Sequence, residues 1–338
     1  MTAMNLPSTL SAWPDFDDIL VQAISGGLIN ESFTLGDPPI AVLQRQHPLF
    51  PAAVNEDIEA VTVHLARKEI PTPLLVRTGQ GELCHVDEDD RCWRILTWIP
   101  GRSVDQIDDS AMAAQAGRIV ARWHRGTADL DHSFHFARPG AHDTDAHMDA
   151  LKDSLKEHAG HRLHSQVAAL AQSLFEAWNQ WDGRVDGPPR ICHGDLKISN
   201  IRFSEQGKAI CLLDLDTMAA QALDIELGDA ARSWCNPLGE DSANNRFDSR
   251  IFQAAFEGYL HENPLPPEER EALPAGVERI CLELAARFAS DALNETYFGW
   301  NPNIAPGRGE HNLLRAQGQA SLASSVHQQR SELEAILS

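Results

Sequence analysis

The spacing of apolar residues changes once along the chain, near residue 100. Before that point, short apolar runs are separated by Gly and Pro, which is typical of strands and turns. In one segment, Val54, Ile58, Val61 and Leu65 recur at helical spacing instead. We predict a short helix over residues 15–23, a longer helix over 53–69, and five strands, over 24–35, 40–46, 74–78, 83–87 and 91–98.

The remaining residues carry mostly helical periodicity. Pro100 and Gly101 mark the boundary, because both residues interrupt regular structure. Helices are predicted over 110–128, 148–158, 165–182, 247–263, 267–298 with a break near Pro274, and 311–337. Two apolar runs joined by a Gly-containing turn predict a small hairpin over 198–213. We therefore expect an α+β protein, with residues 1–100 as one domain and 101–338 as a second.

The composition narrows the possible functions. The 338 residues are 43% hydrophobic and 23% charged, which is ordinary for a globular protein with well-buried cores. The formal net charge of −21 argues against nucleic acid as a partner, because its phosphates would be repelled. Six cysteines without a metal-binding spacing indicate a reduced, cytoplasmic protein. We expect no signal peptide and no membrane span, and a monomer or homodimer.

A largely polar loop contains four histidines, His132, His135, His142 and His147. Zinc sites on helices commonly use a His-x₃-His pair together with a matching carboxylate. Neither feature is present in this loop, so we expect no zinc site there.

The predicted hairpin holds polar residues that suit phosphate chemistry. Asp195 precedes its first strand, Asn200 begins that strand, and Asp214 ends the second. The oxygens of Asn200 and Asp214 suit Mg²⁺, which prefers a few protein oxygens plus waters and substrate phosphates. Asp195 then faces a substrate hydroxyl as a general base. Upstream, Gly26 and Gly27 form a pair without side chains, whose backbone N–H groups can approach a phosphate.

The hairpin motif resembles that of a known superfamily. The residues His193-Gly194-Asp195-Leu-Lys197 with Asn200, followed by Asp214-Leu215-Asp216, resemble the aminoglycoside phosphotransferase and choline kinase superfamily. This resemblance implies a bilobal protein-kinase-like fold, with a five-stranded antiparallel sheet and one helix in the first lobe and a mostly helical second lobe with a small catalytic hairpin. It also implies the use of ATP and Mg²⁺.

Further sequence segments resemble those of one branch of this superfamily, the branch that contains N-acetylhexosamine 1-kinases. They are 42–47 with 55–65, 214–217 with 228–232, and 286–298 with 311–316. This branch phosphorylates the anomeric C1 hydroxyl of its sugar. His-Asn-Asp is common there, whereas this chain has His193-Gly194-Asp195.

The resemblance also implies a set of site residues. Asp195, Lys197 and Asn200 would be catalytic, and Asn200, Asp214 and Asp216 would hold the metal. The nucleotide would contact Ser25, Gly26, Gly27, Asn30, Ser32, Arg45, Glu56 and the hinge residues Thr97, Trp98 and Ile99. Arg45 would replace the kinase lysine, with Glu56 or Glu59 as its acidic partner. His193 would support the loop, and Asp229, expected to open a helix, would brace it.

Candidate acceptor contacts are Asp195, Arg287, Asp291 and Tyr297, and the rings of Trp234 and Trp300 can stack on a sugar. Other kinases of the superfamily, acting on an aminoglycoside, choline, homoserine or another small alcohol, are alternatives. A nucleotide-binding pseudokinase is a non-enzymatic alternative, because Arg45 stands where kinases have lysine. A metal-dependent hydrolase would use the same acids but would not explain Gly26 and Gly27.

Overall fold

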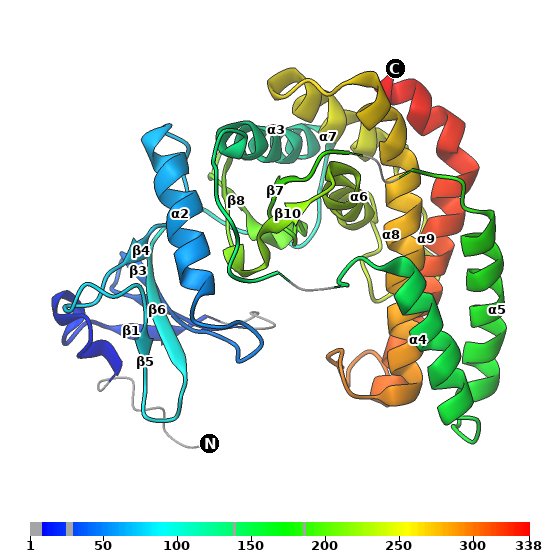
Figure 1. Ribbon diagram of the computed structural model, residues 1–338, viewed down its shortest axis with the longest axis horizontal. Coiled ribbons are helices and arrows are strands. Elements are labelled where there is room, and N and C mark those ends of the chain that lie inside the picture. Colours follow the sequence, from blue (N-terminus) through cyan, green and yellow to red (C-terminus); the bar gives the residue numbers. More distant parts are fainter. Residues whose placement is uncertain (1–8, 25–29, 138–139, 185–186) are drawn as a thin grey trace.

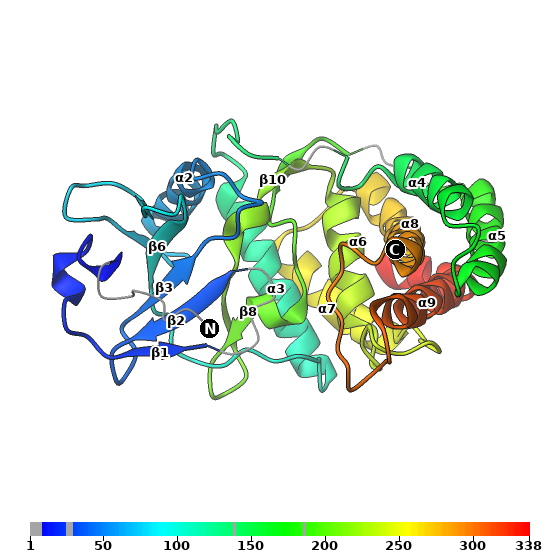
Figure 2. The ribbon, with the colours of Figure 1, turned by 90° about the horizontal axis from the view of Figure 1, so that it is seen from below.

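The computed structural model describes residues 9–24, 30–137, 140–184 and 187–338. A sheet with one long helix forms one end of the molecule, and helices dominate the other end (Figure 1). The turned view shows β8 (Ile201–Phe203) and β10 (Ala219–Gln221) between the blue sheet and the other helices (Figure 2). The predicted α+β class, with an antiparallel sheet followed by a helical part, is confirmed.

The sheet contains six strands within the described residues. They are β1 (Val21–Ala23), β2 (Glu31–Leu35), β3 (Ala41–Arg45), β4 (Leu75–Val76), β5 (His85–Val86) and β6 (Cys92–Thr97). Their order is β1-β2-β3-β6-β4, with β5 also pairing with β6, and all pairs are antiparallel.

The predicted helix over residues 15–23 is wrong, and the sheet has one strand more than the five expected. The segment forms a 3₁₀ turn at Pro14–Phe16 and then β1, where Val21 pairs with Leu35. Ile19 and Val21 both pack against the buried cluster that contains Leu35. Apolar residues two positions apart lie on the same side of an extended chain, so the spacing of Ile19 and Val21 indicates an extended segment rather than a helix.

The sheet has an apolar face and a polar face. Leu43 on β3 belongs to a buried cluster with Phe33, Leu35, Trp93 and Ile95. Arg45 is two residues further along β3 and therefore lies on this same face. Ser32, Gln44 and Arg94 are register partners across β2, β3 and β6 and form a polar row on the opposite face.

Helix α2 (Val54–Arg67) connects the sheet to the helical part and matches the helix predicted over 53–69. It lies beside the sheet on the side of α3 (Ser110–Thr127) (Figure 1). Val54, Ile58, Val61 and Leu65 are buried in the larger hydrophobic core, together with apolar residues of α3. The apolar stripe of α2 thus holds the two parts together.

The helical part surrounds two short antiparallel sheets of two strands each. Its further helices are α4 (Thr144–Glu157), α5 (His164–Gln180), α6 (Leu223–Trp234), α7 (Ser249–Glu262), α8 (Pro267–Asn294) and α9 (Arg308–Leu337). Strand β7 (Arg190–Cys192) pairs with β10, and β8 pairs with β9 (Ala209–Leu212) in the hairpin that the sequence predicts. Within the described residues, no helix is both long and apolar enough to span a bilayer.

Helix α8 is continuous, although we expected a break near Pro274. A proline inside a helix removes one backbone hydrogen bond and clashes with the preceding turn. Leu273, Pro274 and Val277 are all buried. We attribute the helical conformation through this proline to their packing, which offsets the lost bond.

The segment that joins the two parts is fastened to β8. Arg102 and Phe203 exchange two backbone hydrogen bonds of 2.8 Å. Gly101 has a φ of +120°, and a Cβ there would lie 2.2 Å from the Phe203 carbonyl oxygen. Only glycine fits this close approach. The proposed domain division at residues 100 and 101 lies at this connection and stays a prediction.

Candidate active site

Four side chains predicted to carry the chemistry converge below the sheet. Lys197 Nζ lies 2.6 Å from Asp195 Oδ2 and 3.9 Å from Asp214 Oδ2. Asn200 Nδ2 donates to Asp195 Oδ2 at 3.0 Å and to the Asp195 carbonyl at 2.9 Å. The N–H of Leu213 donates to the Asn200 carbonyl at 2.8 Å. This bond keeps the start of one strand beside the end of the other.

The backbone of this loop adopts two left-handed conformations. Gly194 has a φ of +80°, and a Cβ there would lie 2.3 Å from the Thr217 carbonyl oxygen. Asp214 has φ 63° and ψ 64°, a conformation that costs a residue with a side chain about 1 kcal/mol or more. Such strain is concentrated at functional sites, where the surrounding structure imposes it.

The electrostatics of the cluster suit a divalent cation. Burial raises the pKa of Asp214, the neighbouring carboxylates Asp216 and Asp195 raise it further, and Lys197 opposes this shift. Burial alone would lower the pKa of Lys197, but Asp195 and Asp214 outweigh it and the pKa is raised. Lys197 therefore stays charged. A bound cation would relieve the remaining repulsion between the carboxylates, and the oxygens of Asn200 and Asp214 are ligands that Mg²⁺ accepts.

Asp216 faces the sheet rather than the metal position we expected for it. Arg94 Nη1 lies 2.5 Å from Asp216 Oδ1, and Arg94 Nη2 lies 2.8 Å from Oδ2. Asn30 Nδ2 also donates to Oδ2, at 2.5 Å. Asn30, predicted as a nucleotide contact, therefore orients Asp216, and the Asn30 oxygen accepts the His47 N–H at 2.9 Å. Both oxygens of Asp216 are occupied by protein groups.

Arg94 contacts the candidate site, and our sequence analysis missed it. Besides Asp216, its guanidinium donates to Gln44 at 2.8 Å and to Asn55 at 3.3 Å. Gln44 in turn donates to Ser32, a predicted nucleotide contact, at 3.1 Å. The alternation of side chains along a strand could have predicted this position. Arg94 lies between the core residues Trp93 and Ile95, so its side chain must point to the opposite face of the sheet.

Arg45 does not take the role of the kinase lysine in this structure. Its guanidinium pairs with Glu31 and lies 5.7 Å from the centre of the Trp93 ring, on the apolar face of the sheet. Glu56, the expected partner, is instead 3.4 Å from His135, and Glu59 pairs with Arg77 at 2.6 Å. The side chain of α2 that reaches Arg94 is the neighbouring Asn55.

The three residues predicted as the hinge lie where the sheet meets the β8–β9 hairpin. Thr97 exchanges hydrogen bonds of 2.9 Å with Leu74, and the Trp98 N–H donates to the Ile40 carbonyl at 3.2 Å. Arg202 lies 4.9 Å from the Trp98 ring centre and donates to the Ile99 carbonyl at 3.1 Å. Ser25, Gly26 and Gly27, the predicted phosphate contacts, lie outside the described residues.

The loop of residues 193–200, called the catalytic loop below, is braced by the carboxylate of Glu226 rather than by that of Asp229. Its two oxygens accept the N–H groups of His193 at 2.8 Å and Gly194 at 2.9 Å. His193 is fully buried and donates from Nε2 to the Leu213 carbonyl at 2.8 Å, which supports the predicted orienting role. Because α6 begins at Leu223, Asp229 lies in the middle of that helix and does not open it.

Asp229 faces a mixed group of charges between α6 and α8. Burial by itself would raise the pKa of Asp229, but Arg232, His142 and Arg287 outweigh it, so the pKa is lowered. Arg232 Nε lies 2.8 Å from Asp229 Oδ1. Arg287 contacts the ring of Phe298 at 5.7 Å, and no hydrogen bond or ion pair engages its guanidinium within the described part of the chain.

The other expected acceptor contacts have structural roles or stay exposed. Asp291 is buried, and its carboxylate accepts the N–H groups of Thr296, Tyr297 and Phe298 and the amide of Asn312. This use leaves no lone oxygen for a substrate, so the structure does not support direct contact by Asp291. Tyr297 is 57% exposed, and its ring meets that of Phe298 edge to face.

The two tryptophans considered as stacking platforms differ in exposure. Trp234 is buried and donates to the Leu196 carbonyl at 2.7 Å, inside the catalytic loop. Its role is therefore to support the loop rather than to stack on a sugar. Trp300 is 45% exposed and donates to the Ala305 carbonyl at 2.8 Å, so its ring is accessible.

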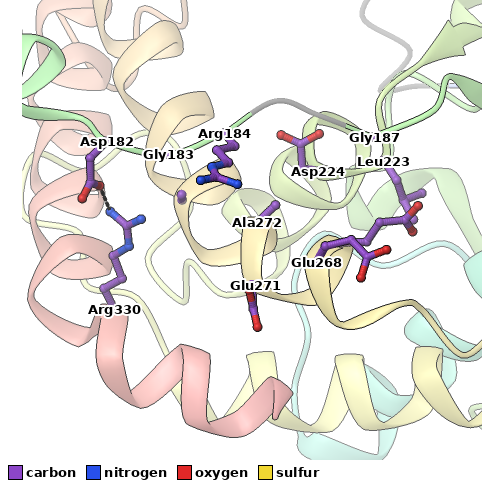
Figure 3. A pocket seen from close by; sticks show the side chains of 12 residues that line it. Asp182, Gly183, Arg184, Gly187, Leu223, Asp224, Glu268, Glu271, Ala272 and Arg330 are labelled. Carbon is purple, nitrogen blue, oxygen red and sulfur yellow. Dashed lines mark hydrogen bonds and ion pairs between the residues drawn. The ribbon is translucent and has the colours of Figure 1, made fainter.

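A separate cavity of about 330 Å³ opens near the start of α8 (Figure 3). Acidic residues and two arginines line it, including Asp182, Glu268, Glu271, Arg184 and Arg330. Asp182 pairs with Arg330 at 2.5 Å. No residue predicted for the site is among its described lining residues, so we place the candidate site at the catalytic loop.

Comparisons with known proteins agree with the observed fold. A sequence model of the phosphotransferase enzyme family (APH) matches residues 20–272. A homoserine kinase from Beijerinckia indica subsp. indica is 26% identical over 236 residues, which cover 68% of this chain and 67% of that protein.

Two solved structures share the fold at low identity. A microcompartment-associated aminopropanol kinase has a TM-score of 0.67 at 16% identity, with 98% of this chain and 99% of that chain covered. Amicoumacin kinase hAmiN, in complex with AMP-PNP, Ca²⁺ and Ami, has a TM-score of 0.65 at 14% identity, with 94% and 92% covered. At these identities the likeness concerns the fold alone.

Proposed function

Because this chain belongs to the phosphotransferase enzyme family, we propose that it transfers the γ-phosphate of ATP to a hydroxyl group of a small polar acceptor. The observation that carries this proposal is the convergence of Asp195, Lys197, Asn200 and Asp214. A base, a cation and two metal ligands at one point are the parts that phosphoryl transfer requires.

Asp195 is the proposed general base. Its Oδ2 lies within hydrogen-bond distance of Lys197 and Asn200, so the carboxylate is held in one orientation. It accepts the proton of the acceptor hydroxyl as that oxygen attacks the γ-phosphate. Lys197 remains charged and neutralises the transferred phosphate. Most of the rate enhancement then comes from position and charge, as in other phosphoryl transfers.

Asn200 and Asp214 are the proposed metal ligands. Asn200 uses its amide nitrogen on Asp195, so its amide oxygen is the atom that can bind a cation. Mg²⁺ bound here would neutralise the β- and γ-phosphate oxygens. We assign Asp216 to the orientation of the loop against Arg94 and Asn30.

The nucleotide is proposed to lie against the polar face of the sheet. Ser32 and Gln44 would border the phosphates on this face, and Thr97, Trp98 and Ile99 would border the adenine. We also propose that Ser25, Gly26 and Gly27 contact the phosphates, because the sequence motif predicts this role.

The acceptor is proposed to lie between α6 and α8, where it would contact two opposite charges, Asp229 and Arg287. Asp229 is close enough to Lys197 to raise the pKa of that lysine. Asp229 therefore lies near the group of Asp195, Lys197, Asn200 and Asp214, which we call the catalytic cluster. A carboxylate at Asp229 suits hydroxyl or ammonium donors of the acceptor, and Arg287 suits a carbonyl or carboxylate. An N-acetylhexosamine phosphorylated at C1 offers ring hydroxyls and an acetamido carbonyl, and it is our first candidate.

A homoserine-like amino alcohol is the second candidate. It carries an ammonium group for Asp229 and a carboxylate for Arg287, whose guanidinium forms no hydrogen bond or ion pair among the described residues. The relative named homoserine kinase also favours this acceptor.

The test is ADP release with Mg-ATP across a panel of N-acetylhexosamines, other sugars, homoserine, amino alcohols and aminoglycosides. Turnover with an N-acetylhexosamine, with phosphate at C1, supports the first candidate, and preference for homoserine supports the second. Asp195→Asn should abolish turnover while ATP still shifts the melting temperature. Asp149→Asn, on an exposed face of α4 and paired with Lys152, is the matched control. ATP binding without turnover of any acceptor would indicate the pseudokinase alternative.

A further inference from the structure

We propose that Asp57, His132 and His135 form a binding site for Zn²⁺ or a similar transition-metal dication, separate from the catalytic cluster. Asp57 lies on α2, and the two histidines lie in the loop that follows α3. The site would join the helix beside the sheet to the helical part of the molecule.

The three donor groups converge on one point. His132 Nε2 and His135 Nδ1 each lie 2.8 Å from the same atom, Asp57 Oδ1. The three ligand atoms lie within 4.8 Å of one another. Two ring nitrogens directed at one carboxylate oxygen form a small group of donors, in which a cation would replace the protons now shared with Asp57.

The groups around the donors hold them in a suitable orientation. Asp57 is buried and accepts the N–H groups of His135 at 3.0 Å and Phe136 at 3.2 Å. Glu56 Oε2 lies 3.4 Å from His135 Nε2. When Nδ1 gives up the proton that it shares with Asp57, Nε2 can keep a proton that faces Glu56, and the lone pair of Nδ1 is then available to an ion. Metal-binding histidines commonly have such a carboxylate partner on the other nitrogen.

The loop is also fixed by packing. The Phe136 ring meets the Phe50 ring edge to face at 5.5 Å, and the His132 ring meets that of Phe134 at 5.1 Å. The side chain of His135 is 44% exposed, so an ion can enter from solvent.

The chemistry of the donors selects the metal. Two imidazoles and one carboxylate are a common ligand set for zinc, with water in the fourth position. Mg²⁺ prefers oxygen ligands throughout, so the catalytic cluster and this site should take different ions. The carboxylate was missed in our sequence analysis because Asp57 lies 75 residues from His132 along the chain.

An ion here would restrain α2 next to the residues that contact Asp216. Asn55, two residues before Asp57, accepts from Arg94 at 3.3 Å, and Arg94 pairs with Asp216. A ligand that binds the folded state alone raises its stability, so Zn²⁺ should raise the melting temperature.

The experiment titrates the chelator-treated full-length protein with ZnCl₂ against a chromophoric chelator, with and without excess Mg-ATP. We expect one tightly bound equivalent that Mg-ATP does not displace. His135→Ala and His132→Ala should each weaken this binding by about tenfold or more. Co²⁺ should give an absorption spectrum of a nitrogen-ligated ion in the wild type that is lost in His135→Ala.

His64→Ala is the matched control, because His64 also lies on α2 and has one carboxylate partner, Asp129, at 2.9 Å. Its zinc affinity should equal that of the wild type. Equal affinity in wild type and His135→Ala, or no tight equivalent at all, would overturn the proposal. Displacement of zinc by Mg-ATP would also overturn it, because the ion would then be at the catalytic loop.

Discussion

Arg94 on β6 and Asp216 after the β8–β9 hairpin form a two-bonded ion pair in which both side chains are only 1% exposed. The pair connects the polar face of the sheet to the segment that carries Asp214. Each charge is buried against the other, so the loss of either partner leaves an uncompensated charge in the protein interior.

Arg94→Met should therefore destabilise the fold by about 3–5 kcal/mol and raise the KM for ATP. Urea unfolding and steady-state kinetics measure the two effects. Arg45→Met is the control, because its partner Glu31 is 46% exposed, and such surface pairs contribute about 1 kcal/mol or less. A higher KM for ATP in Arg45→Met but not in Arg94→Met would show that we assigned the wrong face of the sheet.

Glu226→Gln should lower kcat while leaving the KM of the acceptor nearly unchanged. Glu226 holds the N–H groups of His193 and Gly194, so its replacement shifts the loop that positions Asp195. Asp229→Asn should have the opposite pattern, with a raised acceptor KM, because Asp229 is proposed to face the acceptor. The same pattern in both variants would contradict the separate roles.

The stability of the protein should also depend on Glu226 at acid pH. Burial alone would raise the pKa of Glu226, but the hydrogen bond and charge of His124 and the loop N–H group of Gly194 outweigh it. Because the folded pKa lies below the ordinary value of 4.5, the stabilisation is complete above that pH and is lost as the pH falls through the lowered pKa. Thermal unfolding of Glu226→Gln should show a weaker loss of stability below pH 4.5 than the wild type.

Asp291→Ala should destabilise the protein by about 2 kcal/mol or more, because three backbone N–H groups lose their acceptor. Arg287→Met, one turn earlier on α8, should change stability by about 1 kcal/mol or less and raise the acceptor KM. Chemical denaturation and kinetics together separate the two. A stable Asp291→Ala with a raised acceptor KM would restore Asp291 as a substrate contact.

Gly194→Ala should reduce both stability and kcat, because its Cβ would lie 2.3 Å from the Thr217 carbonyl beside the general base. Gly207→Ala is the matched control. It has a similar φ of +76°, but a Cβ there meets nothing within 4 Å. The control should lose about 1 kcal/mol of stability from strain and keep its kcat. Equal kcat values in both variants would show that the loop tolerates the shift.

The amino-acid sequence alone predicted the α+β class, the helix now seen as α2, and the loop that brings Asp195, Lys197, Asn200 and Asp214 together. These features depend on residues close in the chain, where helical period, turn residues and a short motif determine the local conformation.

Only the tertiary structure showed that Arg94 faces Asp216, that Glu226 braces His193, and that Asp57 meets two histidines. Arg94 and Asp216 are 122 residues apart, Glu226 and His193 are 33 apart, and the two histidines are 75 and 78 residues from Asp57. A charge is attracted to any opposite charge, and its position along the chain does not say which one it meets. The packing of α2 and α6 against the two short sheets makes that selection, because a buried charge is stable only where the folded backbone places a partner within contact.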